Sequence, residues 1–296
     1  MGRKLAVSTA TGLETVPVLK HPGNAEPLLQ LLDELRQLTL GAGRGDLSGR
    51  IGMARARVSD PRVRIVVLGE PKKGMSTLVN GLIGAEVSAT NSHLSVPVIV
   101  EYGESLTTTI VRTGTNGRAE RQLVDPRNPE ATLGQLSTGV VRAEFTVPHP
   151  LLAEGVVLMD APGALSDDPT RAATTLTMLA AADAALYVSE ARRDYYPAEI
   201  TYLQRIRQIC PTVICVLNKI DVYPQWHETQ QQNRKHLDDA GLEFAIFPVS
   251  SGMRDYANRS GDRQLDIESG VPQLVDYLRD HVLGRADTVA REAVIN

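Results

Sequence analysis

A glycine-bounded loop between two apolar segments is the part of the sequence best suited to bind an anion. The apolar run 63–68 precedes the loop and the run 78–83 follows it, which predicts a strand, the loop and then a helix. Two glycines that enclose four residues let the backbone turn its N–H groups inward, and the helix adds its positive N-terminal end. We therefore predict a phosphate-binding P-loop. Its residues are Gly69, Glu70, Pro71, Lys72, Lys73, Gly74, Met75, Ser76 and Thr77.

Met75 stands where the P-loop pattern requires a lysine. The missing ammonium would have contacted the outer phosphates. A hydrogen bond to a charged group contributes about 1.5–3 kcal/mol, so nucleotide affinity should fall by roughly 10- to 100-fold. The loss to hydrolysis should be larger, because this charge offsets negative charge that develops in the transition state. Lys72 or Lys73 would compensate only if the loop turned one of them inward, and solvent-facing lysines are the favoured interpretation. The sequence is compatible with a natural or an engineered Met75.

An Asp-x-x-Gly segment, Asp160 to Gly163, directly follows the apolar run 155–160. Ligands of parallel sheets bind at the carboxyl ends of the strands. There the Asp160 carboxylate would orient Mg²⁺ through water, the Ser76 hydroxyl would be a direct metal ligand, and the Gly163 amide would sense the terminal phosphate. Alone, Asp-Ala-Pro-Gly is also an ordinary turn.

Asn218, Lys219 and Asp221 form an Asn-Lys-x-Asp segment after the apolar run 212–217. This arrangement selects guanine: the Asp221 carboxylate accepts from the ring N–H and the exocyclic amine, and the Lys219 stem lies along the base. Asn218 is expected to join this loop to the P-loop. Ser250 and Ser251 end the next strand, where a short loop would back the base through its amides, or form only a turn.

Residues 88–97 should carry the catalytic switch of such a site. The threonine expected there falls near Leu94, which cannot bind a metal or hold a water. Thr90, Ser92 and Ser95 are its possible substitutes. The candidate catalytic residues are Ser92, Ser95 and Glu70 of the P-loop. Arg192 and Arg193 would either donate to a phosphate across a dimer or remain solvated, and the second alternative is favoured.

Composition restricts the class of protein. The chain has 296 residues, 42% hydrophobic and 22% charged, with a formal net charge of −4. A chain of this length and composition can bury a sizeable core. The acidic balance, without a Lys/Arg-rich block, argues against a nucleic-acid partner. Cys210 and Cys215 fit reduced core thiols of a cytoplasmic protein. No signal peptide or run of about 18 apolar residues is present, which leaves peripheral contact with the inner face of the cell membrane open.

Short apolar segments alternate with helical patterns, which predicts an α/β fold with a mainly parallel central sheet flanked by helices. Residues 113–139 are rich in Gly, Asn, Asp and Pro and predict an insertion or a long hairpin, and the last 25 residues predict a helical tail beyond the sheet. The expected strands are 62–68, 96–101, 107–112, 140–147, 155–160, 184–189, 212–217 and 244–249. The expected helices are 25–40, a second one ending near 58, 75–83, 170–181, 195–209, 225–240 and 271–283.

In this order the motifs resemble those of a GTPase, and the chain most resembles the GTPase domain of bacterial dynamin-like proteins. Beyond the motifs, the resemblance rests on further segments and residues that are typical of that family: 81–84, 96–103, 150–152, 182–188, Glu199 and Leu203. It implies a P-loop NTPase fold of the GTPase type, GTP or GDP with Mg²⁺ as ligands, and neck-like helices at both ends. The expected divisions are a flexible N-terminus at 1–22, a helical segment at 23–60, the GTPase domain at 61–258 and a helical segment at 259–296.

The resemblance implies a GTPase that pairs through its GTPase domains and acts in membrane remodelling. The family usually has an aromatic residue at Pro71 and threonine at Ala161, besides the departures at Met75 and Leu94. Two hypotheses follow: a GTPase whose hydrolysis is impaired by Met75, or a non-hydrolysing scaffold that pairs with an intact dynamin-like paralogue. The partner would be a second copy or that paralogue. A translational or ribosome-assembly GTPase is disfavoured by the acidic charge and the lack of an RNA-binding module.

Overall fold

The computed structural model describes residues 25–44, 47–48, 51–52, 55, 58–60, 62–87, 96–114, 118–125, 139–161 and 168–284. The predicted segment 1–22 lies outside these residues. So do the candidate site residues Ser92, Ser95 and Gly163, together with Leu94. Among the described residues, no helix is both long enough and apolar enough to span a bilayer.

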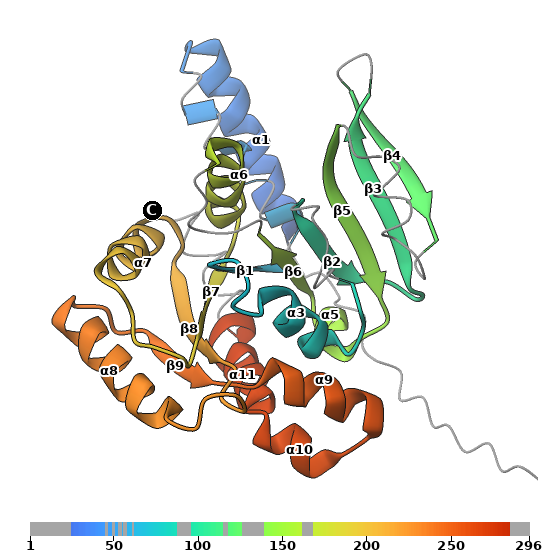
Figure 1. Cartoon of the computed structure of the whole chain (residues 1–296). Helices are drawn as coiled ribbons and strands as arrows, with labels where there is room; N and C mark the ends of the chain where they lie inside the picture. Colours follow the sequence, from blue (N-terminus) through green and yellow to red (C-terminus); the bar gives the residue numbers. More distant parts are fainter. Residues whose placement is uncertain are drawn as a thin grey trace, which may run out of the picture.

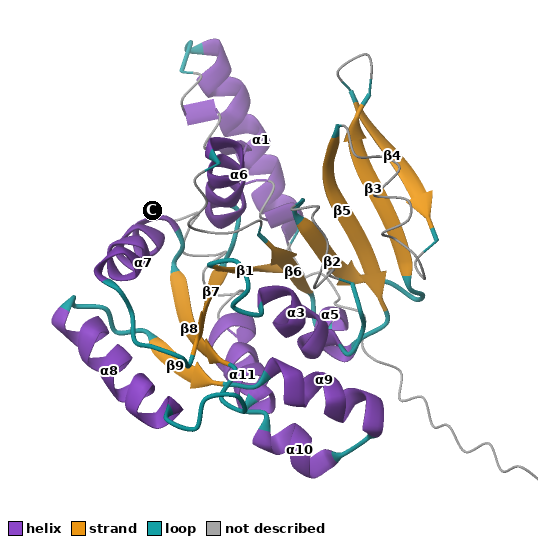
Figure 2. Cartoon of the chain, in the orientation of Figure 1, coloured by secondary structure: helices purple, strands orange, loops and turns teal. Residues whose placement is uncertain are grey.

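Helices and strands alternate along most of the chain (Figures 1 and 2). The strands are β1 (Val63–Gly69), β2 (Val98–Tyr102), β3 (Thr107–Thr113), β4 (Ala119–Val124), β5 (Val140–Val147), β6 (Val156–Asp160), β7 (Ala184–Glu190), β8 (Thr212–Asn218) and β9 (Ala245–Pro248). The helices are α1 (Ala25–Gly41), α3 (Met75–Ile83), α5 (Pro150–Ala153), α6 (Pro169–Ala180), α7 (Pro197–Ile209), α8 (Trp226–Asp239), α9 (Ser251–Ser260), α10 (Arg263–Glu268) and α11 (Val271–Leu278), followed by a π-helical turn, η1 (Arg279–Leu283).

The described strands form one sheet in the order β4-β3-β5-β2-β6-β1-β7-β8-β9. The pairs β1–β6, β1–β7, β7–β8 and β8–β9 are parallel, whereas β2 runs antiparallel to β6. Strand β7 therefore lies between β1 and β8, so the ends of these three strands are neighbours at one edge of the sheet. The predicted mainly parallel α/β sheet is confirmed.

Alternate residues of β1 enter two separate cores, because successive side chains of a strand point to opposite faces. Ile65 and Val67 pack with α3 and α11, and Val66 and Leu68 pack with α6, α7 and α8. Both faces of the sheet around β1 are thus covered by helices (Figure 2). This double coverage explains why the central strands are almost entirely apolar.

The region 113–139 contains a strand that completes a hairpin. Strand β4 pairs antiparallel with β3, and β3 pairs antiparallel with β5. The hairpin alternative for this region is therefore confirmed over its described residues. Figure 1 shows β3, β4 and β5 extending the sheet away from β7 and β8.

The C-terminal part of the chain differs from expectation. Helix α9 was not predicted, α10 lies within the segment 259–296 that was expected to be helical, and α11 was expected beyond the sheet. Instead, Val271, Leu274 and Leu278 are fully buried in the same core cluster as β1 and α3. The apolar stripe of α11 needed a surface to cover it, and the sheet face beside α3 supplies that surface.

The predicted N-terminal helix is confirmed as α1. Most of its leucines are exposed, including Leu31, Leu38 and Leu40, whereas Leu32 is buried. The described residues at 47–48, 51–52, 55 and 58–59 are helical, in the stretch where a second helix was expected. Arg55 Nε contacts Asp33 Oδ1 of α1 at 2.6 Å, which connects this stretch to α1.

Candidate nucleotide-binding site

The P-loop joins β1 to α3 and requires glycine at both of its ends. A Cβ on Gly69 would lie 2.3 Å from the carbonyl oxygen of Val188, and one on Gly74 would lie 2.3 Å from Nδ2 of Asn218. Gly74 also has φ of 93°, which disfavours any L side chain. Gly74 is the N-cap of α3, and no side chain caps this helix start. The first N–H groups of α3 are therefore suitably placed for an anion.

Ser76 and Asp160 meet beside the P-loop. Ser76 lies in the first turn of α3, and Asp160 ends β6, where it pairs in register with Val67 of β1. The Ser76 hydroxyl donates to Asp160 Oδ2 at 2.9 Å, and Asp160 is 7% exposed. A hydroxyl and a carboxylate are oxygen donors of the kind Mg²⁺ accepts. The two predicted metal residues are thus suited, by residue type and proximity, to a magnesium ion.

Asn218 connects the end of β8 to the P-loop, as expected from the sequence. Its Nδ2 donates to the carbonyl oxygen of Lys73 at 3.0 Å. Its Oδ1 accepts from the backbone N–H groups of Lys219 and Ser251 at 2.9 and 3.0 Å, and from the Ser251 hydroxyl at 2.9 Å. Asn218 is 1% exposed, and both the nitrogen and the oxygen of its side-chain amide make hydrogen bonds. One side chain therefore holds together the P-loop, the loop after β8 and the start of α9.

Lys219 adopts a left-handed backbone conformation with φ of 66°, and its side chain turns back toward the P-loop. Its Nζ donates to the carbonyl oxygen of Lys72 at 2.7 Å. Asp221 is exposed, and its Oδ1 accepts from the Ser250 hydroxyl at 2.6 Å. The loop after β8 is thus oriented from two sides, by the P-loop and by Ser250.

Ser250 is more than part of a closing turn. It is the N-cap of α9, and its hydroxyl accepts from the backbone N–H of Met253 at 3.0 Å. The expectation of a short loop or a plain turn missed this helix, whose apolar content is low. Ser250 therefore both begins α9 and orients Asp221.

Met75 occupies the first position of α3 and is half-buried. Its sulfur lies 3.4 Å from the point where a Cβ on Gly69 would stand, and the side chain packs against the core cluster of β1 and α3. The side chain therefore runs toward the first P-loop residue. At this position it supplies apolar contact and no charge.

The two lysines of the P-loop behave differently. Lys72 is exposed, as expected. The expectation of solvent exposure is wrong for Lys73, whose side chain is only 14% exposed. Its Nζ lies 3.0 Å from Glu190 Oε1 and 3.5 Å from Glu70 Oε2, so two carboxylates hold the ammonium.

Glu190, at the end of β7, is the residue of this site that the sequence did not indicate. Its second oxygen, Oε2, accepts from Lys219 Nζ at 2.9 Å. Burial raises the pKa of the Glu190 carboxyl, but Lys219 and Lys73 lower it by more, so the net pKa is below its ordinary value. Glu190 therefore remains ionised between two ammonium groups.

A second ion-pair group extends from the P-loop to the start of α7. Arg193 contacts Glu70 at 3.5 Å and donates to Glu199 Oε2 at 2.7 Å, and its guanidinium lies 3.3 Å from the ring centroid of Tyr196. Glu199 is 3% exposed and also accepts from the Tyr187 hydroxyl at 3.0 Å. The favoured expectation of a solvated arginine is thus wrong for Arg193.

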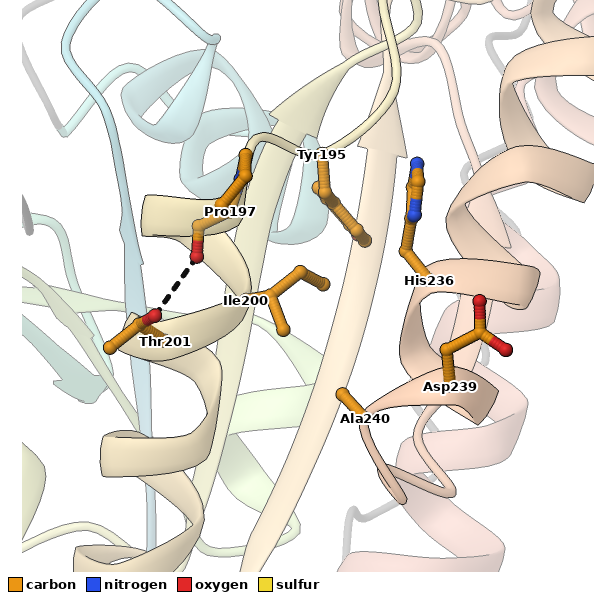
Figure 3. A pocket seen from close by; sticks show the side chains of 7 residues that line it. All are labelled: Tyr195, Pro197, Ile200, Thr201, His236, Asp239 and Ala240. Carbon is orange, nitrogen blue, oxygen red and sulfur yellow. Dashed lines mark hydrogen bonds between the residues drawn. The ribbon is translucent and has the colours of Figure 1, made fainter.

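A cavity of about 360 Å³ lies between α7 and α8 (Figure 3). Its lining residues come from the loop before α7, from α7 and from the last turn of α8 and its cap. The His236 ring contacts Asp194 at 2.7 Å beside it. The residues that line it are Tyr195, Pro197, Ile200, Thr201, His236, Asp239 and Ala240. None of them belongs to the P-loop or to the loop after β8, so this cavity is separate from the candidate nucleotide site.

Comparisons with known proteins bear on the family and the fold of the chain. Residues 65–220 match the sequence profile of the Dynamin family. The isoniazid-induced protein IniA of Mycobacterium tuberculosis is 31% identical over 289 residues, which cover 95% of this chain and 45% of IniA. The chain thus spans less than half the length of this curated relative.

Two solved chains share the fold. Both come from structures described as an oligomerised bacterial dynamin pair that provides a mechanism for long-range sensing and tethering of membranes. The first has a TM-score of 0.63 and 14% identity, and the matched region covers 90% of this chain and 46% of the solved chain. The second has a TM-score of 0.64 and 15% identity, with coverages of 91% and 53%.

Proposed function

The chain belongs to the dynamin family, and from that premise we propose that it binds a guanine nucleotide and hydrolyses it poorly or not at all. The observation that carries this proposal is a contrast within one site. The side chains expected to hold the base are interconnected through Asn218, Lys219 and Ser250. The position expected to contact the outer phosphates carries Met75.

Guanine selection follows from hydrogen-bond chemistry. An ionised Asp221 only accepts, and guanine offers two adjacent donors, its ring N–H and its exocyclic amine. Ser250 already donates to Asp221 Oδ1, so the carboxylate is held in orientation before a base arrives. Adenine presents no such donor pair, so GDP should bind far more tightly than ADP. Mg²⁺, bound by Ser76 and through water by Asp160, would neutralise charge on the phosphates.

Weak hydrolysis follows from the placement of the cations. The Met75 side chain is uncharged and packs against the core, and the Lys73 ammonium is held by Glu190 and Glu70. Phosphoryl transfer depends on positive charge directed at the transferring group. Neither side chain supplies that charge in this arrangement.

We further propose that the chain pairs with another dynamin-like subunit and takes part in membrane remodelling. Two observations support this part: the membership in the dynamin family and the fold shared with a bacterial dynamin pair that senses and tethers membranes. A scaffold with an intact base site and a weakened phosphate site would depend on its partner for turnover. An impaired GTPase that works alone is the second candidate.

Titration calorimetry of the chain with GDP, GTP and ADP in the presence of Mg²⁺, followed by measurement of phosphate release, tests the proposal. We expect binding of GDP and GTP, at least 100-fold weaker binding of ADP, and phosphate release close to the uncatalysed rate. Equal affinity for ADP would overturn the guanine assignment. Ordinary GTP turnover would overturn the assignment of weak hydrolysis.

A further inference from the structure

We propose that Glu190 is a positioning residue that holds Lys219 in place for the nucleotide base and joins it to the P-loop. The inference rests on the proposed function, since it concerns how that site is preorganised. It is carried by one juxtaposition, a single carboxylate between the ammonium groups of Lys73 and Lys219.

The sheet topology places Glu190 at the centre of the site. Strand β7 lies between β1, which leads into the P-loop, and β8, which leads into the base loop. Glu190 is the last residue of β7 and pairs in register with Asn218 at the end of β8. The Glu190 side chain can therefore reach a lysine of each loop.

The contacts of Glu190 are directional. Oε1 accepts from Lys73 Nζ at 3.0 Å, and Oε2 accepts from Lys219 Nζ at 2.9 Å. The Glu190 side chain is 11% exposed, so water screens these contacts only partly. Each ammonium also has a P-loop partner: Lys73 has the Glu70 carboxylate, and Lys219 has the carbonyl oxygen of Lys72. Glu190 is the partner that the two ammonium groups share.

This arrangement fixes the course of the Lys219 side chain. Its backbone stands at φ of 66°, and its Nζ is held by Glu190 and by the carbonyl oxygen of Lys72, so the methylene stem is anchored at both ends. A stem anchored in this way presents a pre-formed apolar surface to a flat base. Without Glu190, the side chain would have to be ordered on binding, and the lost rotamer freedom would weaken affinity.

A neutral amide cannot replace the carboxylate. In Glu190→Gln, the amide oxygen accepts from one ammonium while the NH₂ group faces the other, so one lysine loses its contact with residue 190. We expect Glu190→Gln to bind GDP about 10-fold more weakly, since a hydrogen bond to a charged group is lost. Glu190→Asp keeps the charge on a shorter side chain and should recover part of the affinity.

A double-mutant cycle with Lys219→Met distinguishes positioning from general stability. GDP affinity is measured by calorimetry for the full chain, Glu190→Gln, Lys219→Met and the double variant, with thermal unfolding of each. If Glu190 acts through Lys219, Glu190→Gln has no further effect on GDP affinity in the Lys219→Met background. Glu154→Gln, which removes an exposed partner of Arg279, is the matched control and should bind GDP normally.

The outcomes separate the inference from the proposed function. GDP binding by the parent chain with unchanged affinity in Glu190→Gln would overturn the inference alone. An equal loss in both backgrounds of the cycle would also overturn it, since Glu190 would then act independently of Lys219. If Glu190→Gln fails to fold, the GDP affinity of Glu190→Asp is measured in the parent chain and in Lys219→Met, and the same criteria apply. Absence of GDP binding by the parent chain would overturn both proposals.

Discussion

The side-chain amide of Asn218 donates to the carbonyl oxygen of Lys73 at 3.0 Å, across 145 residues of sequence. This bond connects the loop expected to hold a base to the loop expected to hold phosphates. It is short because Gly74, the next residue of the P-loop, has no side chain in the way. The distance between the P-loop and the loop after β8 is therefore limited by a glycine and an asparagine.

Gly74→Ala should disrupt this spacing. A Cβ at this position would stand 2.3 Å from Asn218 Nδ2, and φ of 93° adds strain. We expect a loss of about 1–3 kcal/mol in the free energy of unfolding and at least a 10-fold loss of GDP affinity. Urea unfolding and calorimetry measure the two effects.

Gly84→Ala is the matched control for Gly74→Ala. Gly84 caps the other end of α3 with φ of 61°, but the nearest atom to its added Cβ is 3.7 Å away. This variant should lose stability through backbone strain and keep its affinity for GDP. If both variants bound GDP equally well, the steric link between Gly74 and Asn218 would have no role in binding.

Asp221→Asn tests the base assignment. The amide replaces one acceptor by a donor, so it cannot accept from both guanine donors. Two hydrogen bonds to a charged group are affected, and we expect at least a 100-fold loss of GDP affinity. Calorimetry with GDP and with xanthosine diphosphate, whose ring carries an oxygen in place of the amine, should show the preference reversed.

Ser250→Ala should have a smaller effect on the same interaction. It leaves the Asp221 charge in place and removes only the hydroxyl that orients it at 2.6 Å. We expect about a 5-fold loss of GDP affinity, together with a modest loss of stability from the missing cap of α9. A larger loss of affinity than in Asp221→Asn would contradict the proposed roles.

Local motifs made part of the site predictable. The P-loop glycines, Asp160 and Asn218 each stand within a few residues of an apolar strand, so their position at the strand ends follows from sequence. Glu190 does not share this property. Its partners Lys73 and Lys219 lie 117 and 29 residues away, and only the order β1-β7-β8 brings them together.

In the fold too, local sequence patterns predicted individual helices but not the surfaces against which they pack. Val271, Leu274 and Leu278 recur at helical spacing, so the helix was predicted, but spacing does not tell which surface covers it. Helix α9 was missed because few of its residues are apolar. Its start depends on the Ser250 cap, whose hydroxyl is also bound to Asp221.

The stability of the site should depend on pH through Glu190. Burial raises its pKa, and the contacts with Lys219 and Lys73 lower it by more, so the folded pKa lies below the ordinary value of 4.5. A carboxyl with a lowered folded pKa contributes stability above pH 4.5 and loses it as pH falls through the folded pKa. The parent chain should therefore lose more stability between pH 6 and pH 3 than Glu190→Gln, as measured by urea unfolding. Parallel losses would contradict this contribution.

Cys215 should be unreactive in the folded chain. Burial raises the pKa of its thiol to about 12, and a hydrogen bond with Tyr195 opposes this less strongly. The thiolate is the reactive form, so it is scarce at pH 8. Ellman's reagent should detect both cysteines in denaturant and react slowly with the native chain. In Cys210→Ala, any reaction of the native chain would be assigned to Cys215. Rapid native reaction would show that the β8 core opens readily.

Met75→Lys should restore charge at the phosphate end of the site. The Met75 side chain already runs toward Gly69, and lysine has a similar unbranched stem, so the substitution fits the same course with an added ammonium. We expect GDP and GTP to bind about 10- to 100-fold more tightly, from a hydrogen bond to a charged group of about 1.5–3 kcal/mol. Met75→Leu keeps the apolar contact without the charge and should bind as the parent does. If Met75→Lys also released phosphate from GTP, loss of the lysine would account for weak hydrolysis. If it bound tightly and still failed to turn over, the deficit would lie in the segment 88–95 as well, where Leu94 stands in place of the expected threonine.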